Sequence, residues 1–185
     1  MDEKAALILV DIQYDYFPGG KMTLDGIDAA SVNASRLLGR FRKKRMPVFH
    51  VRHLAVHPGA TFFLPDTPGS EIHASVSPVA DETVIVKHFP NSFRETSLLD
   101  RLQKAGVASV AVCGAMSHMC IDATVRAASD LGFKCLVAHD ACATRALTFG
   151  RETAPAAQVH AAFMAALSAA YAQVLSTEEL NRKIA

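Results

Sequence analysis

Several features that would indicate a membrane, secreted or nucleic-acid-binding protein are missing from this sequence. Its longest apolar runs are far shorter than the roughly 20 residues that a transmembrane helix needs. The first residues, MDEKAALILVD, are acidic and lack the basic start and the cleavage site of a signal peptide. The formal net charge is only +1, and no basic stripe is present. We therefore expect a cytoplasmic protein that binds neither membranes nor nucleic acid.

Common metal and cofactor motifs are absent as well. The four cysteines, at positions 113, 120, 135 and 142, form no CxxC pair and no zinc-type spacing. In a reducing compartment we expect them to be free thiols. No GxGxxG motif is present, which leaves a dinucleotide site with little support. We therefore expect no cofactor.

What the chain does have is a regular alternation of apolar runs and amphipathic segments. The runs have the form of buried parallel strands, and the segments between them have helical spacing. The expected strands are 5–11, 47–53, 83–88, 107–114, 133–140 and 173–177, and the expected helices are 26–45, 95–106, 120–131 and 151–172. This alternation predicts a single α/β domain over residues 1–185, with a six-stranded parallel sheet covered by helices on both faces.

Three reactive side chains lie at the ends of expected strands. Asp11 ends the first strand, Lys87 lies at the end of the third, and Cys120 follows the fourth after a short turn. Sites in open α/β sheets lie beyond the carboxyl ends of the strands, so we expect the three to share one site. We also expect the helix that follows Cys120 to stabilise its thiolate. Taken singly, each residue has an ordinary structural explanation as a turn aspartate, a solvent-reaching lysine or a core cysteine.

Three stretches around these residues resemble the isochorismatase-like cysteine hydrolases. They read LILVDIQYDYF, VIVKHFPNSF and VCGAMSHMCIDATVRAASDLGF, the last followed by VAHDACAT. The resemblance covers nearly the whole chain and implies a three-layer α/β/α fold with strand order 3-2-1-4-5-6. It also implies a catalytic triad of Asp11, Lys87 and Cys120. A non-proline cis peptide between Ala115 and Met116 is implied too, with an oxyanion hole formed by the backbone N–H groups of Met116 and Cys120.

Residues beside these motifs are candidates for substrate binding. We expect five of them to line the pocket, namely Tyr14, Phe17, Asn91, Phe93 and His118. For Tyr14, Phe17 and His118, surface packing is an equal alternative. Asp140 matches a family position, but a turn or cap role is the better explanation for it. The irregular 54–82 segment is long for a compact domain, so we expect it to shape the pocket.

Several histidines raise the question of a metal. They gather around the second expected strand and the 54–82 segment, at His50, His53, His57 and His73. The nicotinamidase branch of the family binds a divalent metal here through an Asp-x-His element. That element is absent from FHVRHLAVHPG, and in a strand His50 and His53 would point to opposite faces. We therefore expect no metal.

The resemblance implies a metal-independent hydrolase that cleaves the C–N bond of a small amide or carbamoyl-type substrate through a thioester. Two alternatives remain open. One is vinyl-ether hydrolysis of the isochorismatase type, and the other is a non-catalytic or redox-sensing member in which Cys120 is only an oxidisable thiol. The family habitually associates, and the expected helix 151–172 is apolar around much of its circumference. We therefore expect a homo-oligomer, either a dimer or a tetramer.

Overall fold

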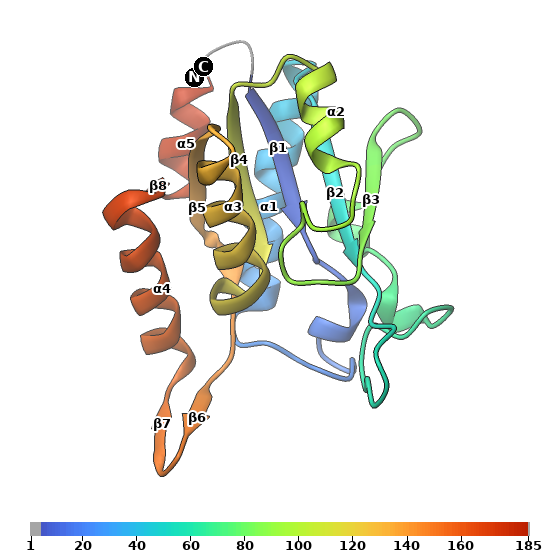
Figure 1. Cartoon of the computed structure of the whole chain (residues 1–185), viewed down its shortest axis with the longest axis vertical. Coiled ribbons are helices and arrows are strands. Elements are labelled where there is room, and N and C mark those ends of the chain that lie inside the picture. The colour runs from blue at the N-terminus through green and yellow to red at the C-terminus, as the bar shows by residue number, and fades with distance from the viewer. Residues whose placement is uncertain (1–4, 185) are drawn as a thin grey trace.

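Six parallel strands form the central sheet of the computed structural model, which describes residues 5–184 (Figure 1). The strands are β1 (Ala5–Val10), β2 (Val48–His53), β3 (Thr83–Lys87), β4 (Ser109–Ala115), β5 (Lys134–Ala143) and β8 (Ala172–Leu175). Their order across the sheet is β3-β2-β1-β4-β5-β8. The predicted order is confirmed. The sixth strand of the sheet is the eighth along the chain because a hairpin precedes it.

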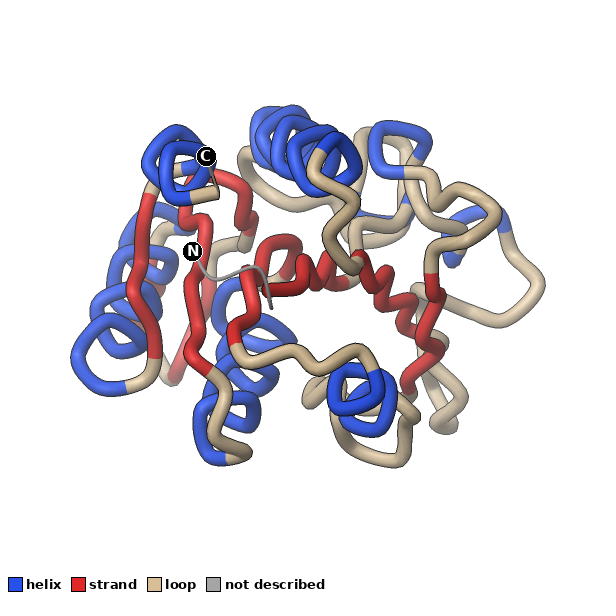
Figure 2. The backbone as a smooth tube through the Cα atoms, turned by 90° about the horizontal axis from the view of Figure 1, so that it is seen from above, coloured by secondary structure: helices blue, strands red, loops and turns tan. Residues whose placement is uncertain are grey.

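Helices cover both faces of this sheet, as the view from above shows (Figure 2). Behind it in Figure 1 lies α1 (Ile27–Lys43), which contacts α5 (Thr177–Lys183). In front lie α2 (Leu98–Lys104) and α3 (Asp122–Asp130), and α4 (Ala156–Ala170) packs beside α3 and β8. The α/β/α layering is therefore confirmed. Among the described residues, no helix is long and apolar enough to cross a membrane.

The central strand explains why the sheet forms here. All six residues of β1, AALILV, are buried, and β1 pairs in parallel with β2 on one side and β4 on the other. A strand covered by helices on both faces has no solvent side, so an unbroken apolar run suits it better than an alternating pattern.

Two segments near the C-terminus differ from the prediction. The expected helix 151–172 begins only at Ala156, because β6 (Leu147–Phe149) and β7 (Glu152–Ala154) first form an antiparallel hairpin. Pro155 then caps α4 and separates it from this hairpin. Helix α5 was not predicted, although its capping box between Ser176 and Glu179 is readable as the spacing S-x-x-E.

The segment between β2 and β3 contains only two short 3₁₀ turns, η2 (Pro68–Ser70) and η3 (Ala74–Val76). Its far end is anchored by Glu82. The Arg42 guanidinium contacts both carboxylate oxygens at 2.7 Å, and Nε2 of His50 lies 2.8 Å from Oε2. Burial alone would raise the pKa of Glu82, but hydrogen bonds from Arg42, the Val79 amide and His50 lower it from 4.5 to about 2.

We predict that Glu82→Gln is less stable than the wild type at neutral pH. A carboxyl with this lowered pKa contributes at most about 3 kcal/mol to the free energy of unfolding, and solvent screening of the partly exposed Arg42 reduces this figure. The contribution is complete above the pKa that Glu82 has in the unfolded chain. It is lost as the pH falls through the pKa that Glu82 has in the folded protein. The difference between variant and wild type should therefore shrink between about pH 5 and pH 2.

Urea unfolding at several pH values measures this difference. Glu71→Gln is the matched control, because Glu71 pairs with Arg52 at an exposed site, where ion pairs contribute little. A Glu82→Gln deficit that stays constant across the acid range would contradict the proposed anchor.

Candidate active site

Four strands of the sheet bring their carboxyl ends together at one edge. Val10, the last residue of β1, is in register with Val51 of β2 and Gly114 of β4. The following residue, Asp11, donates its amide to the Val51 carbonyl at 3.0 Å. Gly114 has φ +126°, and a Cβ there would lie 2.0 Å from the Val10 carbonyl oxygen. The missing side chain lets β4 approach β1 where the two chains leave the sheet.

Asp11 and Lys87 form a fully buried ion pair at this edge. Lys87 Nζ lies 2.7 Å from Asp11 Oδ2, and both side chains are 0 % exposed. Lys87 is in register with His53 at the end of β2, so its side chain passes the intervening strand to reach Asp11. The carbonyls of Phe89 and Pro90 also accept from Nζ, at 3.1 and 3.2 Å. The sequence could not show whether Lys87 spans this distance, and in the structure it does.

The ion pair keeps both of its members charged. Burial would raise the pKa of Asp11, but the ammonium of Lys87, helped by His53, holds that pKa below its usual value. Burial likewise opposes the charge on Lys87, yet the Asp11 carboxylate raises the pKa of Lys87 above its usual value. The site therefore contains a carboxylate and an ammonium at neutral pH.

Cys120 lies beside this pair. It sits in a single π-helical turn, η4 (Ser117–Ile121), which joins the cis Ala115–Met116 peptide bond to α3. Its Sγ, a carboxylate oxygen of Asp11 and a ring nitrogen of His53 all lie within 4.8 Å of one another. The structure thus brings Asp11, Lys87 and Cys120 together at one point.

Burial and the nearest charges act against the Cys120 thiolate. Cys120 is only 4 % exposed. Burial first, and the Asp11 carboxylate second, raise the pKa of the Cys120 thiol far above its usual value, while Lys87 lowers it by less. Desolvation and the neighbouring carboxylate outweigh the lysine, so these surroundings favour the protonated thiol.

Sequence reasoning missed two residues that build the site. His53 was considered only as a metal ligand, yet its Nδ1 lies 3.3 Å from Lys87 Nζ and 3.8 Å from Asp11 Oδ2. Gln13 holds the His53 backbone at both ends: its Nε2 donates to the His53 carbonyl at 2.9 Å, and its Oε1 accepts from the His53 amide at 2.7 Å. Both depend on contacts between distant segments, and no local pattern in the sequence indicates them.

The long segment contributes an aromatic wall next to these residues. Asp15 accepts the Phe63 amide at 2.6 Å, which fixes Phe63 with its ring 4.5 Å from that of Tyr16 and 5.9 Å from that of His53. Tyr16 is buried, and burial, followed by the nearby Cys120 and Asp11, raises the pKa of its hydroxyl well above the usual value. The expectation that residues 54–82 help to shape the pocket is consistent with this contact.

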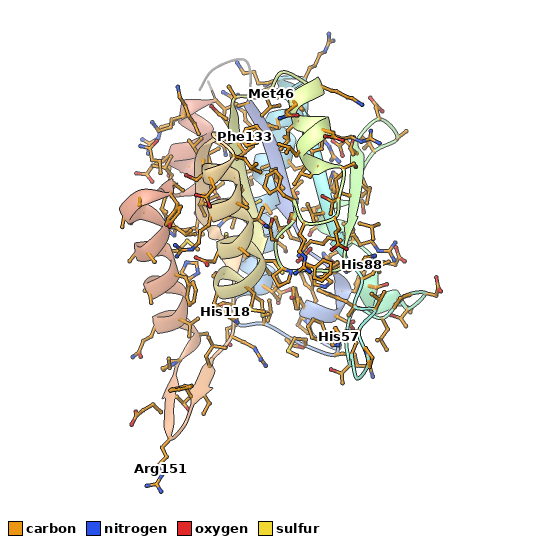
Figure 3. All side chains as sticks on the ribbon, in the orientation of Figure 1. Met46, His57, His88, His118, Phe133 and Arg151 are labelled. Atoms are coloured by element: carbon orange, nitrogen blue, oxygen red, sulfur yellow. The ribbon has the colours of Figure 1, made fainter. Side chains whose placement is uncertain are left out.

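Two of the predicted pocket residues, Phe17 and Tyr14, contact the long segment, and a third, His118, lies in η4. Phe17 stacks on His73 with ring centroids 3.6 Å apart, and Tyr14 lies 4.7 Å from the same ring but is 40 % exposed. His118 follows the cis bond closely, and its Nδ1 lies 2.6 Å from Thr144 Oγ1. Figure 3 shows His118 at the lower end of α3.

The other predicted pocket residues have local structural contacts. Asn91 accepts the Phe93 amide at 2.9 Å, which shapes the loop after β3. The Phe93 ring stacks with Phe133 at 6.3 Å, near the opposite end of α3 from His118 (Figure 3). Asp140 accepts the amide and hydroxyl of Thr177, each at 2.7 Å, and so connects β5 to the start of α5.

A metal fits this centre poorly. Among residues 5–184, the only group of three potential ligand atoms is that of Asp11, His53 and Cys120. The Lys87 ammonium already contacts the first two of them, so a metal cation would have to displace it from a buried position. His50, on the other face of β2, bonds to Glu82 and takes no part in this grouping.

We predict opposite shifts in Cys120 reactivity when the two charges beside it are removed. Asp11→Asn removes the carboxylate that raises the thiol pKa, so alkylation by iodoacetamide should accelerate at a given pH. Lys87→Met removes the cation that lowers this pKa, so alkylation should slow. Peptide mass spectrometry between pH 7 and 11 separates Cys120 from the other thiols, and Cys135 serves as the internal control. Shifts in the same direction in both variants would refute this electrostatic description.

Comparison with known proteins agrees with the geometry. The family model for the isochorismatase domain matches residues 5–179. An uncharacterized isochorismatase family protein, YddQ of Bacillus subtilis, is 54 % identical over 94 % of this chain and 96 % of its own length. A streptothricin hydrolase of Streptomyces noursei is 38 % identical over 75 % of this chain and 49 % of its own.

Solved structures show the same relationship. An isochorismatase from Pseudomonas putida KT2440 superposes with a TM-score of 0.90 and 40 % sequence identity, covering 96 % of this chain and 90 % of the other. The family model spans nearly the whole chain, and the strand order and the site edge agree with the resemblance read from the motifs. The chain is therefore a hydrolase that belongs to the isochorismatase family.

Proposed function

We propose that this hydrolase cleaves the C–N bond of small amide or carbamoyl-type substrates through a thioester on Cys120, without a metal ion. The observation that carries the proposal is the buried Asp11–Lys87 pair, with its 2.7 Å contact, beside the Cys120 thiol. A carboxylate oxygen of Asp11 lies within 4.8 Å of Cys120 Sγ, and the two side chains share a hydrogen bond. Asp11 is therefore placed to accept the thiol proton.

In the first half-reaction, Asp11 takes the proton of Cys120 as the sulfur attacks the substrate carbonyl. The tetrahedral oxyanion is stabilised by the backbone N–H groups of Met116 and Cys120. Asp11 then returns the proton to the leaving amine as the C–N bond breaks. In the second, Asp11 activates a water molecule that hydrolyses the thioester and regenerates the thiol. Lys87 keeps Asp11 ionised at rest.

The same electrostatics disfavour the two alternative activities. A redox sensor needs an accessible thiol with a low pKa, whereas burial and Asp11 raise the pKa of Cys120. Vinyl-ether hydrolysis begins with protonation by an acid, whereas Lys87 holds the pKa of Asp11 low and keeps it ionised. Both observations support a mechanism in which Asp11 acts first as a base.

We predict that Cys120→Ala and Cys120→Ser abolish turnover but remain folded. The screen should cover small amides, ureas, carbamates and cyclic imides, and intact-protein mass spectrometry should trap the thioester on the wild type. Cys135→Ala is the matched control, because this buried thiol lies against α3, where it bonds to the Val125 carbonyl. More than a few per cent of activity in Cys120→Ala would exclude nucleophilic catalysis.

Loss of wild-type turnover in EDTA, restored by zinc or manganese, would contradict the metal-free part of the proposal.

We further propose that the chain forms a homo-oligomer through the β6–β7 hairpin and α4. The hairpin projects from the body of the molecule, with Arg151 at its tip (Figures 1 and 3). Phe149 on this hairpin is 93 % exposed, and an isolated two-stranded hairpin is marginally stable in water. The exposed side of α4 consists mostly of alanines. Packing against a second copy would cover these apolar surfaces.

We predict that sedimentation at micromolar concentration shows a species larger than the 19.8 kDa chain. Phe149→Asp should shift the distribution toward the monomer, because a charge at the interface is costly to desolvate. Val32→Asp, at a 53 % exposed site on α1, is the control and should not change it. A wild type that is monomeric at this concentration would refute the proposal.

A further inference from the structure

The turn that carries the proposed oxyanion donors is held by a side chain from α4. Ser117, the residue after Met116, is fully buried. Its hydroxyl donates to the Ala143 carbonyl of β5 at 3.3 Å, and its Oγ lies 2.9 Å from Nδ1 of His160. The sequence separation between Ser117 and His160 is 43 residues, so this contact exists only in the folded chain.

The contact between Ser117 and His160 suits a neutral imidazole ring. Burial, and to a lesser extent His139, lower the pKa of His160, which favours the neutral ring. Neutral imidazole has one nitrogen that donates and one that accepts, and the serine hydroxyl can do either, so both tautomers allow a hydrogen bond at this 2.9 Å separation. His160 therefore holds Ser117 from the side of α4.

A second contact joins the same two elements. Phe163 lies three residues after His160 on α4, so the two side chains share one helix face. Its ring meets the His118 ring edge-on, with centroids 6.0 Å apart. His118 is also held by Thr144, the residue that follows β5. The first two residues of η4 therefore each contact α4 on one side and the end of β5, or the residue after it, on the other.

We infer that His160 is a positioning residue for the oxyanion hole. By holding Ser117, it keeps the backbone N–H groups of Met116 and Cys120 directed at the point where the substrate oxygen becomes negative. The inference rests on the proposed function and extends it, because it assigns a role in the reaction to a helix outside the strand-end site. His160 itself touches neither the substrate nor the reacting sulfur in this assignment.

The test compares His160→Leu with His160→Asn on the best substrate of the amide screen. Leucine removes the hydrogen bond to Ser117, whereas the asparagine amide offers both a donor and an acceptor near the Nδ1 position. Loss of one oxyanion donor costs about 10²–10³ in rate, so a misdirected donor in His160→Leu should lower kcat about 10–100-fold. KM should change by less than about threefold, because the lost interaction belongs to the transition state. His160→Asn should keep kcat within about threefold of the wild type.

Two further variants sharpen the test. Ser117→Ala should resemble His160→Leu, and the double variant should be no worse than either single one, because both break the same contact. His139→Leu is the matched control: the His139 ring lies 6.4 Å from the His160 ring, and among the described residues His139 has no hydrogen bond to the turn. An unchanged kcat in His160→Leu, an equal loss in His160→Asn, or losses that multiply in the double variant would each overturn the inference.

A measurement without substrate separates this inference from the proposed chemistry. Hydrogen exchange of the peptide covering residues 116–121 should be faster in His160→Leu and wild-type-like in His160→Asn. If Cys120→Ala remained active, the proposed function would fail, and the exchange data would still report on the turn. If Cys120 proved essential but hydrogen exchange of residues 116–121 in His160→Leu stayed at the wild-type rate, the positioning role of His160 would be refuted and the proposed function would stand.

Discussion

The buried contact between Asp11 and Lys87 is the constraint on which the site depends. Two charges removed from water are tolerable only because each compensates the other, and loss of one partner of such a pair typically costs about 3–5 kcal/mol. The pair also links the ends of β1 and β3 across β2, so the outer strand must keep its register for Lys87 to reach Asp11. Stability and chemistry therefore depend on the same 2.7 Å contact.

This pair also accounts for the state of the thiol. Ionising Cys120 at rest would place a second negative charge beside Asp11 in a pocket that water barely reaches. The buried site favours one carboxylate and one ammonium, with the sulfur neutral. Transfer of the thiol proton to Asp11 as the carbon–sulfur bond forms never requires two unshielded anions, because the charge moves from the carboxylate to the substrate oxygen. A cysteine nucleophile in this setting gains its reactivity from an adjacent base rather than from a lowered pKa.

Elements remote from the strand ends hold the remaining parts in place. Gln13 holds His53 at the end of β2, and Asp15 holds Phe63 of the long segment, so both are fixed to the region that follows β1. The proposed donors depend in turn on η4, whose residues contact both β5 and α4. Since α4 follows the projecting hairpin and also contacts η4, it connects the surface proposed for self-association with the turn beside Cys120.

The sequence by itself determined the parallel sheet and the identity of the three residues that meet at its edge, and the strand order followed from the resemblance that its motifs carry. Apolar runs, polar residues at strand ends and sequence motifs are local signals, so each can be recognised without knowledge of the tertiary structure. Tertiary structure decided what depends on distant segments: the reach of Lys87 past β2, the place of His53 and Gln13, and the contact of His160 with Ser117. It also decided the protonation of Cys120, because a motif shows which groups are neighbours but not how completely water is excluded from them. The hairpin before α4 escaped prediction because Glu152–Ala154 lie next to a strongly helical segment, and their strand conformation depends on pairing with Leu147–Phe149.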